Sequence, residues 1–125
     1  MTRLECYYRS EDAPTLPLAA GIILRDISDQ TWSADNIIAY WLTADYEAGN
    51  MGNGVVFSSA YKTTKQQADS HLLLTLEQDI SKSIIYYAGS CWDANAEFSS
   101  YEKWQQYLKN FKDRIDNPVV ITIKD

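Results

Sequence analysis

The sequence has few of the residues that build metal and redox sites. Its 125 residues include one histidine and two cysteines, Cys6 and Cys91, which form no paired-cysteine motif. A structural zinc ion takes four cysteine or histidine ligands, so this composition argues against such a site. We therefore expect neither a metal nor a cofactor. Both cysteines stand beside aromatic residues in apolar segments, which predicts buried free thiols, with a disulfide as the alternative.

The sequence also has few basic residues and no long apolar run. Lysine and arginine number 11 against 17 acidic residues, which gives a net charge of −6. The densest basic stretch, residues 103–114, is interleaved with acids. Nucleic acid and anionic membranes bind positive patches, so we expect neither as a partner. No segment approaches the roughly 20 apolar residues of a membrane span, and the first residues carry no apolar signal-peptide core.

What the sequence does contain is a series of short strand-like segments spread over the whole length. Alternating or continuous runs of aromatic and β-branched residues, separated by polar turns, are typical of strands. We expect one domain over residues 1–125, mainly β: an antiparallel sandwich or curved sheet of about seven strands with one C-terminal amphipathic helix. The expected strands are Leu4–Tyr8, Leu18–Leu24, Asn36–Thr43, Gly54–Ser58, His71–Glu77, Ser83–Ala88 and Val119–Ile123.

Two of these segments carry a more specific expectation. The continuous apolar run of residues 18–24 predicts a central strand that is covered on both faces. A short polar turn through Asp79 and Lys82 separates the strands expected at 71–77 and 83–88. Such a connection predicts that these two strands pair as a hairpin.

The helix has the clearest signal. Five large apolar residues follow one another at spacings of three and four, which places them on one helical face. Asn117-Pro118 ends the helix, because proline cannot continue helical geometry. The residues on the apolar face are Tyr101, Trp104, Leu108, Phe111 and Ile115.

An aromatic and acidic cluster suggests ligand binding. Tyr87 lies in an expected strand, and Trp92, Asp93 and Asn95 follow where the strand ends, a position at which loops often carry function. The C–H face of a sugar ring stacks on indole, and its hydroxyls bond to carboxylates and amides. We therefore name Trp92, Tyr87, Trp41, Asp93 and Asn95 as candidate ligand-binding residues. The alternative is that Trp92 packs into the core under the helix.

Catalytic and metal-binding interpretations have weaker support. Asp69 and His71 would point the same way from a strand, so the carboxylate could orient the imidazole as a general base. With Asp93 they are the candidate catalytic residues, although a structural histidine is the simpler interpretation. The loop residues Asp45, Glu47, Asn50 and Asn53 offer oxygen ligands for calcium, but their spacing matches no EF-hand loop.

Most of the chain resembles a bacterial domain-of-unknown-function family, number 4861. The resemblance is carried by an unusual order of motifs and spans about residues 16–123. The motifs are Asp69-Ser70-His71-Leu72-Leu73, Tyr86-Tyr87-Ala88-Gly89 followed by Trp92-Asp93, and Glu102-Lys103-Trp104-Gln105-Gln106-Tyr107-Leu108. Cys91 stands where a small residue is expected.

The resemblance implies a context for the function. Members of that family are secreted, more than twice this length, and encoded in polysaccharide-utilisation loci beside hydrolases of uronic-acid sugars, including pectin-type substrates. The chain would then be the C-terminal portion of a larger domain in the periplasm or outside the cell, with an oligosaccharide ligand. The alternatives are an enzyme that acts on carbohydrates, and a structural fragment that pairs with a missing N-terminal half or as a homodimer.

Overall fold

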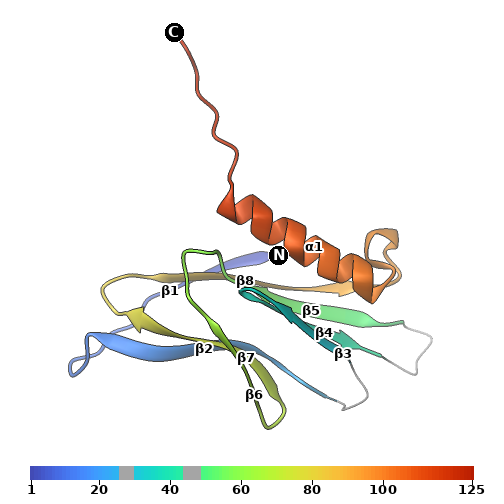
Figure 1. The fold of residues 1–125 in the computed structure, drawn as a ribbon, viewed down its shortest axis with the longest axis horizontal. Helices are drawn as coiled ribbons and strands as arrows, with labels where there is room; N and C mark the ends of the chain where they lie inside the picture. The colour runs from blue at the N-terminus through green and yellow to red at the C-terminus, as the bar shows by residue number, and fades with distance from the viewer. Residues whose placement is uncertain (26–29, 44–48) are drawn as a thin grey trace.

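The computed structural model is a three-layer arrangement of two antiparallel sheets and one helix (Figure 1). It describes residues 1–25, 30–43 and 49–125. The mainly β fold and the C-terminal helix are as predicted. The elements are β1 (Thr2–Cys6), β2 (Thr15–Ile23), β3 (Gln30–Ala34), β4 (Ile37–Leu42), β5 (Met51–Val56), β6 (Thr64–Ala68), β7 (His71–Asp79), β8 (Ile84–Trp92), the 3-10 helix η1 (Ala96–Phe98) and α1 (Tyr101–Asp116).

The larger sheet has the strand order β1-β8-β5-β4-β3, and the smaller one has the order β2-β7-β6. All neighbours in both sheets are antiparallel. Successive side chains of a strand point to opposite faces, so each central strand of the larger sheet contributes to two cores. On β4, Ile38 and Tyr40 face the smaller sheet, whereas Ala39 and Trp41 face the helix.

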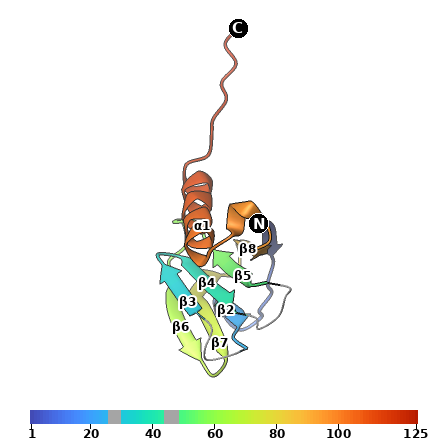
Figure 2. The ribbon, with the colours of Figure 1, turned by 90° about the vertical axis from the view of Figure 1, so that its right-hand side faces the viewer.

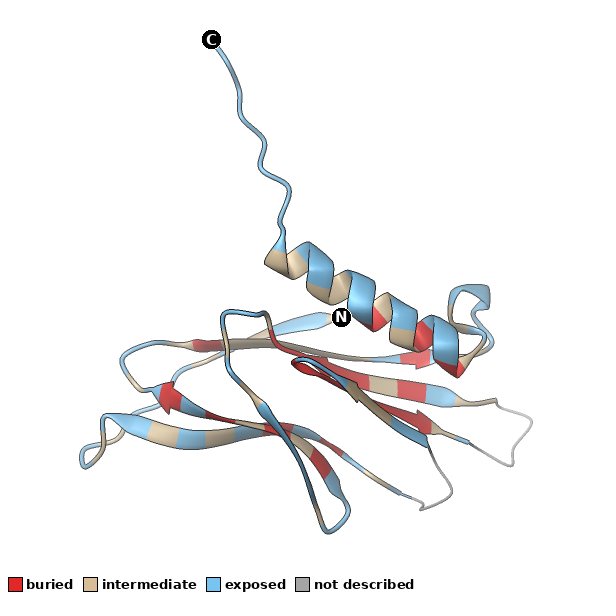
Figure 3. Cartoon of the chain, viewed as in Figure 1, coloured by how far each residue is buried: buried red, intermediate tan, exposed pale blue. Residues whose placement is uncertain are grey.

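The first core fills the space between the two sheets. Its fully buried side chains include Phe57 after β5 and Leu72 and Leu74 of β7. Leu72, Leu74 and Leu76 alternate with more exposed residues, as expected for a strand with one face against a core. In Figure 3 the strands of both sheets carry buried segments that alternate with more exposed ones.

The second core lies between the larger sheet and α1. Trp104 and Leu108 are buried almost completely, and the Trp104 indole N–H donates to the backbone oxygen of Asn53 at 3.1 Å. Gly52 and Gly54 of β5 let the helix lie close, because a Cβ on either would come within 2.9 Å of Trp104 or Leu108. These contacts fix α1 across β5.

The helix ends where the sequence predicts, and hydrogen bonds hold both of its ends. The Ser100 side chain accepts a hydrogen bond from the backbone N–H of Lys103 at 3.2 Å and so satisfies one free donor of the first turn. At the other end, the Asn117 N–H bonds to the oxygen of Asp113 at 2.9 Å. Asp116 accepts from the backbone N–H and the hydroxyl of Ser59, both at 2.7 Å, and this pair anchors the last turn.

The predicted hairpin between residues 71–77 and 83–88 is wrong. The polar turn is present, with the Lys82 N–H bonded to the oxygen of Asp79 at 3.2 Å, but β7 and β8 belong to different sheets. Both strands face the same core, one from each side. An apolar pattern specifies which face of a strand is buried, and it does not specify which strand lies beside it.

The predicted central position of residues 18–24 is also wrong. Strand β2 is an edge of the smaller sheet, and it alternates between buried residues such as Ala20 and Ile22 and exposed ones. The run reads as continuously apolar because Ala19, Gly21 and Ile23 occupy the outer face. Ile23 is 65% exposed, so the sequence places a large apolar residue on a surface position.

Three further differences concern polar edges and the C-terminus. Strands β3 and β6 were not predicted, since their mostly polar residues are typical of turns and their exposed edge positions tolerate such residues. The strand predicted at Val119–Ile123 is absent, and residues 117–125 are exposed and without regular structure. Pairing with a neighbour is what makes a strand, and in this structure these residues have no neighbouring strand.

Cys6 and Cys91 are both free, as predicted. Cys6 packs against the core between the sheets, whereas Cys91 lies in the core under the helix, so the two thiols are on opposite faces of the larger sheet. Burial raises the pKa of the Cys91 thiol to about 11. In the part of the chain that the structure describes, no helix is long and apolar enough to cross a membrane.

Candidate functional site

An exposed tryptophan lies at the end of β8. The Trp92 side chain is 53% exposed, and its cross-strand partner on β5, Met51, is 44% exposed. Tryptophan is usually well buried, so an indole of this exposure is unusual. The alternative interpretation, that Trp92 packs into the core, is therefore wrong. The core position under the helix belongs to the preceding residue, Cys91.

The position of Trp92 follows from strand alternation. Residues 84, 86 and 88 of β8 point toward the smaller sheet, and Ser90 and Trp92 continue the same face. Near the end of β8 this face is open, since Ser90 is exposed as well. The Ser90 hydroxyl donates to the side-chain oxygen of Asn53 on β5 at 2.6 Å. The result is a strip of polar and aromatic side chains on the open end of the larger sheet.

A second pair of residues holds the chain beside the indole. The Asp93 N–H donates to the backbone oxygen of Asn50 at 3.1 Å, and the Asn50 side-chain amide donates to Asp93 Oδ2 at 2.9 Å. These two bonds continue the β5–β8 pairing one step beyond Met51 and Trp92. We call Asn50, Met51, Trp92 and Asp93 together the Trp92 surface.

Gly49 is required beside this surface. Its φ of +91° is one that side chains rarely adopt, and a Cβ there would collide with Asp93 Oδ1 and lie 3.1 Å from Trp92 Nε1. The backbone at Gly49 therefore lies directly against the carboxylate and the indole nitrogen. This close approach restrains both groups.

Asn95 has a structural role in the same loop. Its side-chain oxygen accepts from the Glu97 N–H at 3.0 Å and caps η1, while its own N–H donates to the oxygen of Trp92 at 3.1 Å. The residue is exposed, so its amide group borders the Trp92 surface with the oxygen already occupied. Asn95 therefore positions the loop, and its contribution to ligand binding remains a prediction.

Two other predicted ligand-binding residues lie elsewhere. Trp41 is only 6% exposed and stacks on Tyr101 with ring centroids 5.5 Å apart, so it offers no face to a ligand. This corrects its assignment as a stacking residue. Tyr87 faces the helix, on the opposite side of β8 from Trp92, and packs edge-on against Phe111 at 5.0 Å. The structure does not bring Trp41, Tyr87 and Trp92 together.

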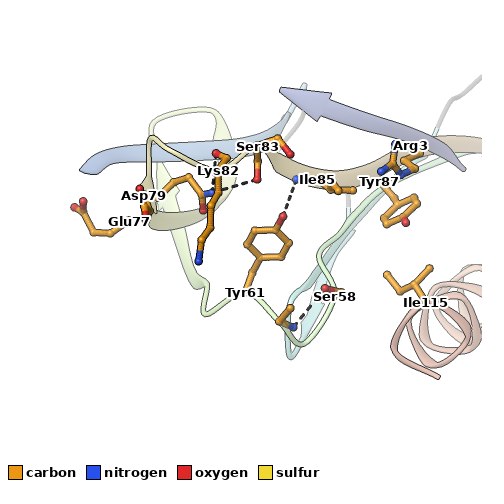
Figure 4. A pocket seen from close by; sticks show the side chains of 12 residues that line it. Arg3, Ser58, Tyr61, Glu77, Asp79, Lys82, Ser83, Ile85, Tyr87 and Ile115 are labelled. Carbon is orange, nitrogen blue, oxygen red and sulfur yellow. Dashed lines mark hydrogen bonds between the residues drawn. The ribbon is translucent and has the colours of Figure 1, made fainter. Parts of the chain in front are cut away.

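Tyr87 instead borders a separate hollow of about 600 Å³ between the C-terminal end of α1 and the loops after β5 and β7 (Figure 4). The Tyr61 hydroxyl closes one side by accepting a hydrogen bond from the Ile85 N–H at 2.8 Å. Ile85 and Ile115 supply apolar walls, and charged residues of both signs, among them Arg3, stand at the rim. The hollow therefore has mixed chemistry and no dominant charge.

The candidate catalytic residues are also dispersed. Asp69 has a φ of +51° and lies in the turn between β6 and β7, so it is not on a strand with His71. The geometric premise that both side chains share a strand face is therefore wrong. Both residues are exposed on the smaller sheet, whereas Asp93 follows β8 of the larger sheet. The structure does not assemble these three groups into one site.

The structure bears on only part of the predicted calcium site. Asp45 and Glu47 lie outside the described residues. Asn50 bonds to Asp93, and Asn53 lies within β5 and accepts from Ser90. In residues 1–25, 30–43 and 49–125, no three acidic, histidine or cysteine side chains come together as a metal site.

Sequence reasoning missed Met51 and the role of Asn50. Both were assigned to a loose glycine-rich loop, because three glycines and two asparagines between residues 45 and 54 are typical of turns. The available signal was the spacing of Gly52 and Gly54, two residues apart. Such spacing on one strand face fits a strand that a helix covers closely.

Comparisons with known proteins give a family and one curated relative. The family model described as "Domain of unknown function (DUF4861)" matches residues 1–121, so the chain belongs to this family, as its motifs suggested. A similar protein is "Uncharacterized protein P7" of Formosa agariphila, 28% identical over an alignment 120 residues long that covers 86% of this chain and 29% of that protein. The chain thus spans less than a third of the relative's length. No solved structure matches.

Proposed function

We propose that this member of the DUF4861 family is a glycan-recognition module whose binding surface is centred on the exposed indole of Trp92. A sugar ring would stack its C–H face on the indole. Its hydroxyls would bond to the carboxylate of Asp93 and to nearby amide groups. The observation that carries the proposal is the 53% exposure of Trp92 beside a carboxylate that is itself held by Asn50.

Pre-organisation supports this assignment. Asp93 is fixed by a bond to the Asn50 side chain and by the close backbone of Gly49, so little side-chain entropy is lost when a ligand binds. Asn95 caps η1 and holds the loop that follows Trp92. Binding sites combine an apolar face with a few positioned polar groups, and this surface has both.

The surroundings favour neutral sugars over uronic acids. Asp93 is next to the indole, Glu97 follows in η1, and the whole chain carries a net charge of −6. A carboxylated sugar would approach like charge, which costs binding energy. Within pectin-type polysaccharides, the neutral residues are therefore the preferred ligands of this surface.

The wider role is part of the same proposal. We place the module in polysaccharide breakdown in the periplasm or outside the cell, where it would recognise or support binding of the polymer for a hydrolase. Recognition is favoured over catalysis because Asp69 and His71 lie on the smaller sheet, away from the strand that carries Asp93. An acid–base pair must share one site to act on one bond.

A titration of the 125-residue chain with neutral and uronic-acid oligosaccharides tests the proposal by calorimetry. Wild type is expected to bind a neutral oligosaccharide, and Trp92→Ala is expected to bind about 5- to 150-fold more weakly, as stacking energies of about 1–3 kcal/mol on aromatic residues imply. Trp32→Phe is the matched control, because Trp32 is partly buried against the core under the helix, where it contacts Lys109.

Two outcomes would contradict the proposal. Equal affinity of Trp92→Ala and wild type would place the ligand elsewhere, with the hollow at Tyr87 as the next candidate. Absence of heat across a panel of plant and algal oligosaccharides would refute glycan recognition by this chain.

A further inference from the structure

We propose that the C-terminal segment Val119–Ile123 is a donor strand that pairs with the open edge of β1 in a second copy of this chain. In this structure the segment is unpaired, and its apolar side chains are almost fully solvated: Val119 is 90% exposed, Ile121 85% and Ile123 88%. Contiguous exposed apolar residues mark interaction surfaces in folded proteins.

The sequence of the segment is that of a strand. Val119, Ile121 and Ile123 occupy alternate positions, and Val120 and Thr122 stand between them, so all five residues are β-branched. A strand with these residues has one aliphatic face. The match to the family model extends to residue 121, so most of the segment belongs to the family's domain.

The segment leaves the body at a fixed point and in a fixed direction. Asp116 is held by Ser59, and the Asn117 N–H is bonded to the backbone oxygen of Asp113. These hydrogen bonds fix the direction in which the chain leaves the helix. Pro118 then restricts the backbone further. In both Figure 1 and Figure 2 the segment runs away from the sheets. This geometry presents the segment to another molecule and not to the strands of its own chain.

The chain also has a suitable acceptor. The described sheets end at β1, β3, β2 and β6. Natural edges are protected by proline or by an inward-pointing charge, and β2 contains Pro17 while β6 directs Lys65 to the face of Leu74. Strand β1 contains no proline, and the residues on its core side are Thr2, Leu4 and Cys6.

Neighbouring side chains favour β1 over β3, since both edge strands have five residues, as the donor has. Strand β1 continues into Tyr7, which is 78% exposed. A β-branched residue opposite an aromatic ring is a favourable cross-strand pair. Strand addition of this kind gains backbone hydrogen bonds along the edge and side-chain contacts on alternate positions. Two copies that exchange their segments would satisfy both edges in one closed dimer.

Oligomeric state tests the inference. Size-exclusion chromatography with light scattering is expected to show a concentration-dependent dimer for the full chain. In the double variant Val120→Pro/Ile121→Pro, one of the two prolines removes an N–H that the donor strand would give to β1, whichever way the strand is oriented. This variant should be monomeric, and so should the chain that ends at Asn117. Lys124→Gln, outside the donor strand, is the matched control and should remain dimeric. Far-UV circular dichroism should show that all of them keep the fold, with no change in the monomeric variants beyond the loss of the donor strand.

Cross-linking identifies the acceptor. A photoreactive residue at Thr122, in a mixture of isotopically light and heavy chains, should join mainly to residues 2–7 of the other copy. A wild-type chain that is monomeric at every concentration would overturn the inference, as would a dimer that persists without residues 118–125. Cross-links within one chain would show that the segment folds back on its own sheets, which also contradicts it.

Discussion

The contact between α1 and β5 gives the sharpest test of the fold, because two glycines on the same face of the larger sheet are covered by different side chains. Gly54 and Gly89 are directly opposite each other on β5 and β8. A methyl group at Gly54 would lie 2.8 Å from Leu108 Cδ2 and 3.2 Å from Trp104 Cζ2, both in the tightly packed core under the helix. At Gly89 it would meet the flexible end of Met1, with Sδ at 2.8 Å.

The magnitude follows from packing. Overfilling a packed core costs roughly 1–3 kcal/mol. Replacing glycine by alanine where the backbone allows it gains about 0.4–1 kcal/mol through the unfolded chain. Gly54→Ala should therefore lose roughly 1–2 kcal/mol of unfolding free energy, whereas Gly89→Ala should change it by about 0.5 kcal/mol or less in either direction.

Urea denaturation followed by tryptophan fluorescence measures the difference. With an m-value of roughly 2 kcal/mol/M, the two variants should differ in midpoint by about 1 M. Trp104 lies at the contact and reports on it directly. Equal midpoints for Gly54→Ala and Gly89→Ala would refute the close seating of the helix on β5.

Three further predictions follow from the same structure. Leu108→Ala removes a fully buried side chain and should cost about 2–5 kcal/mol of unfolding free energy in the same urea assay; a loss below 1 kcal/mol would contradict the burial. Burial raises the pKa of Cys91 to about 11 and that of Tyr101 to about 12, so the folded state keeps protons that the unfolded state releases above about pH 9. The free energy of unfolding should therefore fall as pH rises from 9 to 11. The fall should be smaller in Cys91→Ala, and the difference measures the contribution of the thiol. Neutral oligosaccharides should bind more tightly than uronic-acid oligosaccharides of equal length, with the gap closing in high salt; a gap that salt leaves unchanged would exclude a charge effect at Asp93.

The sequence predicted best what depends on local pattern. The 3-4 spacing from Tyr101 to Ile115 and the Asn117-Pro118 stop placed α1 correctly, since capping and periodicity are properties of neighbouring residues. The strands rich in aromatic and branched apolar residues, β4, β7 and β8, were found for the same reason. Strands β3 and β6 escaped because polar edge strands are held by pairing, which the local sequence does not record.

What failed depends on contacts between distant residues. The partner of β8 is β5 and not β7, and only the packing of two sheets around Phe57 and Leu74 decides this. The same limit applies to the site. Trp92 and Asp93 were correctly placed at the end of a strand, yet burial of Trp41 under Tyr101 could not be foreseen from composition. The role of Asn50 depends on its position across from Asp93, which the pairing of β5 with β8 sets.

The most direct test of glycan recognition at Trp92 is a nitrogen-15 correlation spectrum of the chain, because its four tryptophans give four indole N–H signals. The Trp104 indole is hydrogen-bonded to Asn53 in the core, and Trp41 is buried under α1. On addition of a neutral oligosaccharide, the Trp92 indole signal should shift in a saturable way while the Trp104 and Trp41 signals stay in place. A saturable shift that spares Trp92, or no shift at all, would contradict the account.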